Sequence, residues 1–328
     1  MRFAVVLFLC TCSWTKAQAT DAIGLSFPVR CELGSTCFVQ NYVDHHHGGE
    51  SRDYQCGSRT YDGHDGTDIR LQDLAAQRAG VDVLAAASGR VVGARDGMAD
   101  VSVRAIERAA IAGKECGNGV VLEHENGWHT QYCHMAKGSV RVKLGDQVVR
   151  GQTIGLIGLS GDTEFPHLHI TVRQAASVVD PFAFGASLDS CKEGRPIWTD
   201  VSDAQLQYRT REVLNYGFSA LAPTMELIES GDVKDQPPKG QSYALAAYVR
   251  VIGLRQGDGQ ILSITAPDGS VLSEHTAPPL ANNKAQYFIS SGRNRKTSAW
   301  PKGTYTATYR LMSNGVEHLR KSFDLRLD

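Results

Sequence analysis

The fold is decided by the stretch FPHLHITV, which spans residues 165–172. Its apolar and β-branched residues predict a β-strand, and side chains alternate between the two faces of a strand. His167 and His169 therefore point to the same side, about 7 Å apart by the rise of a strand. Leu168 and Ile170 face the other side and are expected to pack in a core. The pattern predicts a site on one face of this strand and a buried interior on the other.

A second stretch, YDGHDGTDI at residues 61–69, places His64 four residues before Asp68. On a helix the two side chains would share one face, but Gly63 and Gly66 argue against a helix. We expect a tight loop that enters a strand. Histidine and carboxylate are both zinc ligands, and catalytic zinc sites use three protein ligands with one open position.

A third stretch predicts a β-hairpin. The segments GNGVVLEH (residues 117–124) and WHTQYCHM (residues 128–135) alternate in polarity on either side of Asn126-Gly127, a dipeptide that favours a tight turn. His134 is expected near the end of the second strand.

In this order the three motifs resemble the lysostaphin/LytM-type zinc metallopeptidases, a family of peptidoglycan endopeptidases. The likeness covers roughly residues 54–184, which is less than half of the chain. Each motif alone is a weak signal, and their combination in the expected strand and loop settings is a strong one. The motifs are His64-x-x-x-Asp68, His134 after Tyr132, and His167-x-His169.

The resemblance implies that His64, Asp68 and His169 hold one Zn²⁺ per chain. It also implies that His134 and His167 are the catalytic residues beside the metal, without binding it. Zinc lowers the pKa of a bound water to about 7 and polarises the scissile carbonyl. One of these two histidines would move the proton of the water to the leaving amine, and the other would stabilise the charged intermediate. Which residue has which role stays open.

Size and charge limit the other possibilities. The chain has 328 residues, of which 42% are hydrophobic and 21% charged, so about two domains are expected. The formal net charge of -1 gives no sign of a nucleic-acid partner. Peptidoglycan peptide stems are the partner that the resemblance implies, and the oligomeric state stays open.

The N-terminus predicts export. A basic start at Met1-Arg2, an apolar run over residues 3–9 and the small residues around Gln18 are typical of a signal peptide cleaved after Ala19. We therefore expect a periplasmic or extracellular protein, and no stretch predicts a transmembrane helix. A lipoprotein site at Cys12 is disfavoured by the residues that precede it.

Six cysteines would remain after cleavage, an even number that suggests disulfides in an exported chain. Fifteen pairings are possible, of which Cys31–Cys37 is the most local. No Cys-x-x-Cys pair indicates a cysteine zinc site. A nucleophilic Cys133 is disfavoured because the zinc constellation already accounts for His134. The six are Cys31, Cys37, Cys56, Cys116, Cys133 and Cys191.

The fold class predicted for the whole chain is mainly β. An antiparallel β-sheet of the zinc peptidase type would precede a C-terminal β-sandwich, immunoglobulin-like in its short alternating strands and regular turns. The predicted parts are a signal peptide (1–19), an N-terminal extension with a stapled loop (20–52), the peptidase domain (53–186), a linker (187–215) and the β-sandwich (216–328).

Some segments allow two interpretations. Residues 45–47 are three histidines, for which a solvated loop is favoured over a metal site, and the extension that holds them could cover the cleft. Residues 83–95 predict a strand, a glycine turn and a second strand that form a hairpin. Residues 96–116 depart from the family core and are expected to be an inserted loop that could form a cleft wall. Its residues 99–114 are charged and partly helical in composition. Tyr61 is expected to pack, although it could also donate to an oxyanion.

The hypotheses for function come from different classes. The first is a secreted zinc metalloendopeptidase that hydrolyses peptide cross-links of peptidoglycan. The second is a non-catalytic scaffold that binds peptidoglycan or activates another hydrolase, and a third is a peptidase for a substrate outside the wall. The enzyme is favoured because all five family positions are occupied. The bond that is cut stays open.

Overall fold

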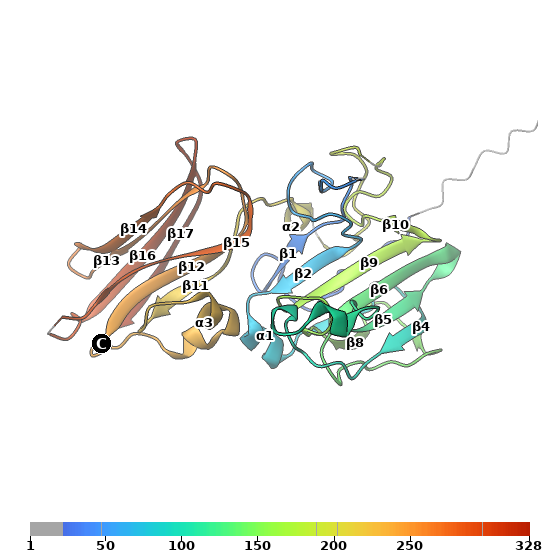
Figure 1. The fold of residues 1–328 in the computed structure, drawn as a ribbon, viewed down its shortest axis with the longest axis horizontal. Coiled ribbons are helices and arrows are strands. Elements are labelled where there is room, and N and C mark those ends of the chain that lie inside the picture. The colour runs from blue at the N-terminus through green and yellow to red at the C-terminus, as the bar shows by residue number, and fades with distance from the viewer. Residues whose placement is uncertain (1–21, 47, 188, 202, 297) are drawn as a thin grey trace, which may run out of the picture.

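The computed structural model describes residues 22–46, 48–187, 189–201, 203–296 and 298–328. These residues fold into antiparallel β-sheets that divide between an N-terminal half and a C-terminal half (Figure 1). The predicted signal peptide lies outside the described residues. Across the described ranges, no helix combines the length and the apolar character that a membrane span requires.

The N-terminal half is built on one antiparallel sheet with the strand order β1-β2-β9-β6-β5-β4-β7, and β10 pairs with β9. Long connections, such as residues 42–66 and 96–117, separate many of its strands, and neighbours such as β2 and β9 are about a hundred residues apart. Its strands are β1 (Cys37–Asn41), β2 (Thr67–Leu71), β4 (Gly89–Arg95), β5 (Asn118–Glu123), β6 (Trp128–Met135), β7 (Gln147–Val148), β9 (His167–Gln174) and β10 (Ser177–Val179).

Strand β9 is the predicted histidine strand, and it lies between β2 and β6. Leu168 and Ile170 are fully buried in the core, as their alternation predicts. In the pairing of β2 with β9, Asp68 lies directly opposite His169. Strand pairing therefore brings together two motifs that are about a hundred residues apart.

The predicted hairpin of β5 and β6 is confirmed. Its turn is η3 (Glu125–Gly127), in which Asn126 has φ 57° and Gly127 has φ 73°. These left-handed conformations are the ones that the Asn-Gly dipeptide adopts at low cost.

The predicted hairpin over residues 83–95 is wrong. Strand β3 (Asp82–Leu84) pairs with β8 (Thr153–Leu156), whereas β4 pairs with β5 and β7. The segment between β3 and β4 begins with Ala85, Ala86 and Ala87, which are all buried. These small side chains let the backbone pass through the core, where it bonds to residues 26 and 151 instead of turning back on itself.

The N-terminal extension and the inserted segment frame this sheet. The extension supplies β1, and its Cys31–Cys37 disulfide closes the local loop that the sequence suggested. The other described disulfides are Cys56–Cys191 and Cys116–Cys133. The predicted partly helical insertion contains the 3₁₀ helices η1 (Val103–Ala105) and η2 (Arg108–Ile111). Helix α1 (Leu74–Ala79) follows β2, and the side chain of Asp73 caps its start.

The C-terminal half contains the antiparallel sheets β11-β12-β15 and β14-β13-β16-β17, which share one apolar core. Alternation is clearest in β16, where Tyr305, Ala307, Tyr309 and Leu311 are fully buried. Strand β14 and helix α3 were not predicted. The strands are β11 (Glu212–Ser219), β12 (Ala244–Leu254), β13 (Gly259–Thr265), β14 (Val271–Ala277), β15 (Lys284–Asn294), β16 (Gly303–Ser313) and β17 (Val316–Leu327); the helices are α2 (Asp203–Leu206), α3 (Met225–Ser230) and η4 (Asp232–Asp235).

Candidate metal centre

The side chains of His64, Asp68 and His169 meet at the centre of the sheet. His64 comes from the loop before β2, Asp68 from β2 and His169 from β9. Asp68 Oδ1 lies 2.9 Å from His169 Nδ1 and 3.2 Å from His64 Nε2. The two ring nitrogens are 3.2 Å apart, and one ligand atom from each residue lies within 4.8 Å of the others. The three predicted metal ligands thus form one compact group that could hold an ion.

Hydrogen bonds on the outer side of each imidazole fix the direction of the nitrogen that faces Asp68. His64 Nδ1 lies 2.7 Å from the carbonyl oxygen of Tyr42, which can only accept, so Nδ1 carries the proton. His169 faces Asp65 Oδ1 through Nε2 at 3.3 Å and Asp68 Oδ1 through Nδ1 at 2.9 Å, so in the metal-free chain both ring nitrogens can donate. His64 Nε2 and His169 Nδ1 converge beside the Asp68 carboxylate, and a metal ion would take the place of the proton on His169 Nδ1. A neutral histidine pair with one carboxylate is a donor set that suits zinc.

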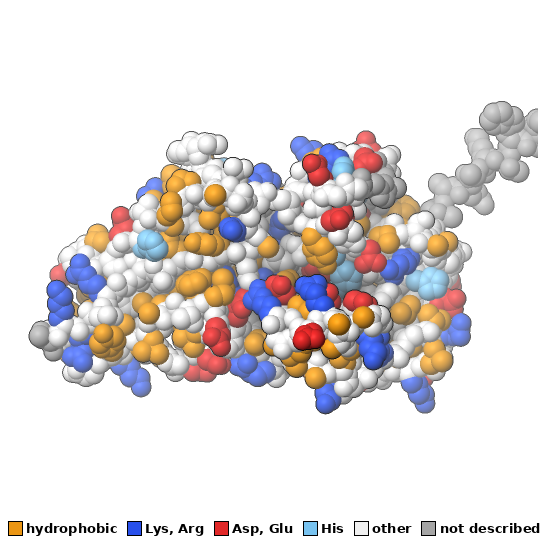
Figure 2. Space-filling view, viewed as in Figure 1, with side chains coloured by type: hydrophobic (Ala, Val, Ile, Leu, Met, Phe, Trp, Pro, Cys, Tyr) orange, Lys and Arg blue, Asp and Glu red, His pale blue; other side chains and the backbone are white. Residues whose placement is uncertain are grey.

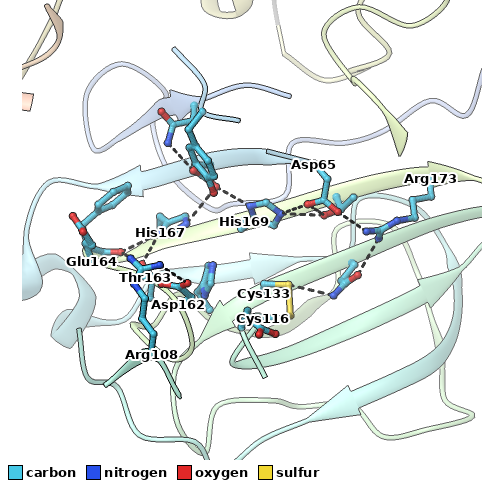
Figure 3. Close-up of a pocket in the computed structure, with 18 residues that line it drawn as sticks. Asp65, Arg108, Cys116, Cys133, Asp162, Thr163, Glu164, His167, His169 and Arg173 are labelled. Atoms are coloured by element: carbon cyan, nitrogen blue, oxygen red, sulfur yellow. Dashed lines mark hydrogen bonds and ion pairs between the residues drawn. A yellow bond between two sulfur atoms is a disulfide. The ribbon is translucent and has the colours of Figure 1, made fainter. Parts of the chain in front are cut away.

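A layer of polar residues orients the carboxylates of this group. Asn41 Nδ2 donates to Asp68 Oδ2 at 2.8 Å, which leaves Oδ1 directed at the histidines. Arg173 Nη2 donates to Asp65 Oδ2 at 2.6 Å, and Arg173 Nη1 donates to Gln131 at 3.0 Å. Figure 3 shows Asp65 between His169 and Arg173. These contacts give His169 a fixed direction before any metal binds.

The close approach of His169 also explains a glycine in the motif. A Cβ atom on Gly66 would lie 2.5 Å from His169 Nε2 and 2.7 Å from the carbonyl oxygen of Ile170. Side chains other than hydrogen would therefore push the loop away from β9 or rotate the imidazole. Gly66 allows the His64–Asp68 loop to pack directly against the histidine strand.

Charge around the site shifts the pKa values of its members. Burial alone would raise the pKa of Asp68, but the neighbouring His64 and His167 hold it well below its usual value. Burial alone would lower the pKa of His169, but hydrogen bonds to Asp65 and Asp68 raise it to about 9. The hydrogen bond from His169 also lowers the pKa of Asp65. The carboxylates thus favour a positive charge at the position that a metal cation would take.

His134 and His167 lie beside this group. His134 Nδ1 lies 2.8 Å from the carbonyl oxygen of Ser160 and therefore donates, which leaves Nε2 unprotonated. His167 Nδ1 lies 2.9 Å from the carbonyl oxygen of Phe165, and its Nε2 faces Asp68 Oδ1 at 3.3 Å. The ring centroids of His134 and His167 are 4.6 Å apart. Burial, followed by the charges of His167 and His169, lowers the pKa of His134 well below its usual value. A neutral His134 can accept a proton at neutral pH.

The backbone at His134 adopts a conformation that is unusual outside glycine, with φ 61°. Its N–H donates to the carbonyl oxygen of Cys116 at 2.8 Å, and its carbonyl oxygen accepts from Gly158 at 2.9 Å. The Cys116–Cys133 disulfide joins the same two segments next to His134. Neighbouring structure thus enforces a conformation of the kind that is concentrated at functional sites.

The site opens into a cleft of about 560 Å³, a size that accommodates a few peptide residues. The inserted segment forms one wall, where Arg108 Nη1 donates to Asp162 Oδ2 at 2.9 Å. Tyr61 is half exposed at the opening, with its ring 4.4 Å from that of His64. Figure 3 shows Arg108 and Asp162 at one end of the cleft and Arg173 at the other.

Sequence reasoning missed part of this site. Asp65 and Arg173 were not predicted, although Arg173 continues the alternation of His167 and His169 on one face of β9. Asn41 gave no local signal, because only the pairing of β1 with β2 brings it to Asp68. The prediction that residues 45–47 form a solvated loop is wrong for His45. This residue is buried, and its Nε2 is hydrogen-bonded to Asp180 Oδ2 at 2.9 Å.

Known proteins match this half of the chain. The model for peptidase family M23 matches residues 62–181. Peptidoglycan DD-endopeptidase ShyA of Vibrio cholerae is 49% identical over 53 residues, which cover 16% of this chain and 12% of ShyA. Cell division protein DipM of Caulobacter vibrioides is 39% identical over 64 residues, which cover 20% of this chain and 10% of DipM. The match thus spans only a small part of each of these relatives.

Among solved structures, the catalytic domain of lysostaphin from Staphylococcus simulans is 25% identical over 43% of this chain and 85% of that domain, with a TM-score of 0.28. Residues 62–181 of the present chain form a peptidase M23 domain. The resemblance that the His64, His134 and His167 motifs predicted is therefore confirmed.

Proposed function

We propose that this protein is a secreted zinc metalloendopeptidase that hydrolyses peptide cross-links of peptidoglycan. The observation that carries the proposal is the convergence of two oriented imidazole nitrogens and one carboxylate oxygen at the floor of a peptide-sized cleft. The peptidase M23 domain and the endopeptidase relatives support the reaction class. The wall substrate comes to this chain by likeness to those relatives.

In this proposal His64 Nε2, Asp68 Oδ1 and His169 Nδ1 hold one Zn²⁺. Zinc supplies a Lewis acid and lowers the pKa of a water ligand to about 7. His134 is the better general base because its Nε2 is unprotonated and its pKa is lowered. His167 is anchored through Nδ1 and, when its Nε2 also carries a proton, would stabilise negative charge that develops on the reacting carbonyl.

The remaining parts of the chain follow the same proposal. Cleavage after Ala19 would release a periplasmic or extracellular enzyme, an environment that suits its disulfides. We infer that the peptidase domain of residues 53–186 also uses β1 of the extension at residues 20–52. The predicted linker at residues 187–215 is corrected, because Ile197 and Trp198 pack in the N-terminal core and β11 begins at Glu212. The proposed immunoglobulin-like sandwich, predicted for residues 216–328, therefore begins at Glu212, and its sheets share an apolar core.

The test combines metal content with digestion of purified wall. The full chain is expected to contain zinc and to release stem peptides whose cross-links are cut, as read by mass spectrometry. His169→Ala should remove both properties. His129→Ala, in the same hairpin as His134 and outside the metal group, should remove neither. A zinc-containing parent that binds wall and leaves every cross-link intact would instead establish a scaffold.

A further inference from the structure

Arg104, in η1 of the inserted segment, joins segments that are far apart in the chain. Its Nη2 lies 2.8 Å from Glu164 Oε2, in the loop that leads into β9. Its Nη1 lies 3.3 Å from Glu229 Oε2, on α3 of the C-terminal half. One guanidinium thus connects the cleft wall, the loop before the catalytic histidines and the second half of the molecule.

A second path leads from Glu229 toward His167. Gln286, on β15, donates from Nε2 to Glu229 Oε1 at 2.8 Å, and its Oε1 accepts from Arg70 Nη1 at 3.3 Å. The buried guanidinium of Arg70 lies 4.2 Å from the ring centroid of Phe165. The Phe165 ring in turn lies 4.7 Å from that of His167. Packed groups therefore run without a gap from the C-terminal half to a histidine of the site.

Glu229 also compensates buried positive charge at this border. Arg250, on β12, is fully buried, and its Nη1 lies 3.5 Å from Glu229 Oε1. A buried guanidinium without a nearby carboxylate is costly, so the position of Glu229 is strongly determined. Figure 2 shows basic and acidic side chains gathered where the two halves meet. In Figure 1 the inserted segment lies at this border, beside α3.

We propose that Arg104 and Glu229 form a clamp by which the C-terminal half fixes one end of the catalytic cleft. Both are positioning residues: Arg104 holds the inserted wall against the loop at Glu164, and Glu229 also supports Phe165 behind His167. The inference deepens the proposed function, because it makes the C-terminal half a structural part of the peptidase site. The substrate-binding surface of the peptidase would then depend on the C-terminal half, which lies outside the matched residues 62–181.

The structure offers a matched control for this clamp. Arg78, on α1, pairs with Asp232 at 3.1 Å and also joins the two halves, with both side chains about half exposed. Neither residue lines the cleft. Arg78 Nη2 also donates to the carbonyl oxygen of Ser230 at 3.1 Å, so Arg78→Ala removes contacts between the halves on the same helix as Glu229. It leaves Arg104, Glu164 and the cleft wall untouched.

The primary experiment is hydrogen exchange followed by mass spectrometry on the full chain. Arg104→Ala is expected to accelerate exchange about two- to ten-fold in residues 99–116 and 160–166, because the local opening of these segments loses a charge-assisted contact. Glu229→Gln, which keeps the shape of the side chain, should affect the same segments. Arg78→Ala should leave both at the parent rate. Arg104→Lys should restore part of the protection, since an ammonium can pair with one of the two carboxylates.

Kinetics on wall peptides provide the second measurement. Arg104→Ala should raise KM about two- to ten-fold with little change in kcat, because the cleft wall binds substrate and performs no chemistry. Glu229→Gln should change both constants, since it also supports Phe165 behind His167. Zinc content should be unchanged in every variant.

The clamp is overturned if Arg104→Ala leaves exchange and KM at parent values. It is equally overturned if Arg78→Ala produces the same changes, because docking of the halves in general would then explain them. A parent protein that cuts no wall peptide would defeat the proposed function alone, and the exchange rates would still decide the clamp.

Discussion

Strands β9 and β16 show how differently the two halves use the same alternation. In β16 the buried face carries apolar side chains together with Tyr305 and Tyr309, and it packs against a second sheet. In β9 one face packs Leu168 and Ile170 in a core, whereas the other buries His167. Strand β16 buries its side chains only in an apolar core, whereas β9 buries some side chains in a core and others beside a polar cleft.

This difference shows where function resides. A buried polar side chain costs free energy unless its hydrogen bonds are satisfied. Ring nitrogens of His64 and His169 both face one oxygen of Asp68, and these nitrogens lie only 3.2 Å from each other. A cation placed among them resolves that conflict. The C-terminal half contains no corresponding metal group within the described residues. Variants on each half can distinguish a functional site on the polar face of β9 from a buried polar cluster with only a structural role.

The largest effect is expected from His169→Ala. Removing this proposed ligand should abolish zinc binding and lower the rate of cross-link cleavage by more than about 10³-fold, because in the proposed mechanism zinc would supply both the nucleophile and the Lewis acid. Metal analysis and digestion of purified wall measure the two losses. Retention of zinc and of cleavage by a folded variant would reduce the polar face of β9 to a structural role.

Leu262→Ala probes the other half. Leu262 is fully buried in the core shared by the C-terminal sheets, so the variant should lose about 2–5 kcal/mol of unfolding free energy. Denaturant unfolding measures this loss. The zinc content of the folded fraction should equal that of the parent. A loss of zinc without a loss of stability would contradict the division of roles between the halves.

The metal-free chain should become less stable as the pH rises from 6.5 to above 9. Its neighbouring carboxylates raise the pKa of His169 to about 9 despite burial, so the protonated ring stabilises the fold. That contribution, on the order of 3 kcal/mol, is complete below the unfolded pKa of about 6.5 and is lost as the pH passes the folded value. Unfolding of chelator-treated protein at pH 6 and pH 9.5 tests this. The zinc-loaded chain should not weaken in the same way, since zinc takes the place of the proton.

Asp65→Asn should have the smallest effect. The amide keeps a hydrogen bond to His169 Nε2 but removes the charge, which should weaken zinc binding about 10- to 100-fold. Competition with a chromophoric chelator measures the affinity. Asp62→Asn, exposed in the same loop, is the control and should bind zinc like the parent. Equal affinities in both variants would show that the carboxylate beside His169 does not tune the site.

Local patterns predicted much of this molecule. Alternation identified β9 and most strands of the C-terminal half, Asn126-Gly127 identified a hairpin, and the family motifs identified the metal group. Each of these patterns consists of residues close together in sequence. Asn41 and Glu229 could not be predicted, because their roles arise from pairing and docking between distant segments. The hairpin predicted for residues 83–95 was wrong because β3 and β4, although adjacent in sequence, pair with β8 and β5 instead of with each other.

Strand β1 has a consequence for where this domain can be cut. Asn41 orients Asp68, and the carbonyl oxygen of Tyr42 orients His64, yet both residues precede the matched range 62–181. A fragment confined to that range would keep every metal-facing atom and lose two of the groups that aim them. It would also leave β2 as an unpaired edge, free to recruit a strand from another molecule. A fragment limited to residues 62–181 should therefore aggregate through its exposed strand edge and bind metal more weakly than the full chain.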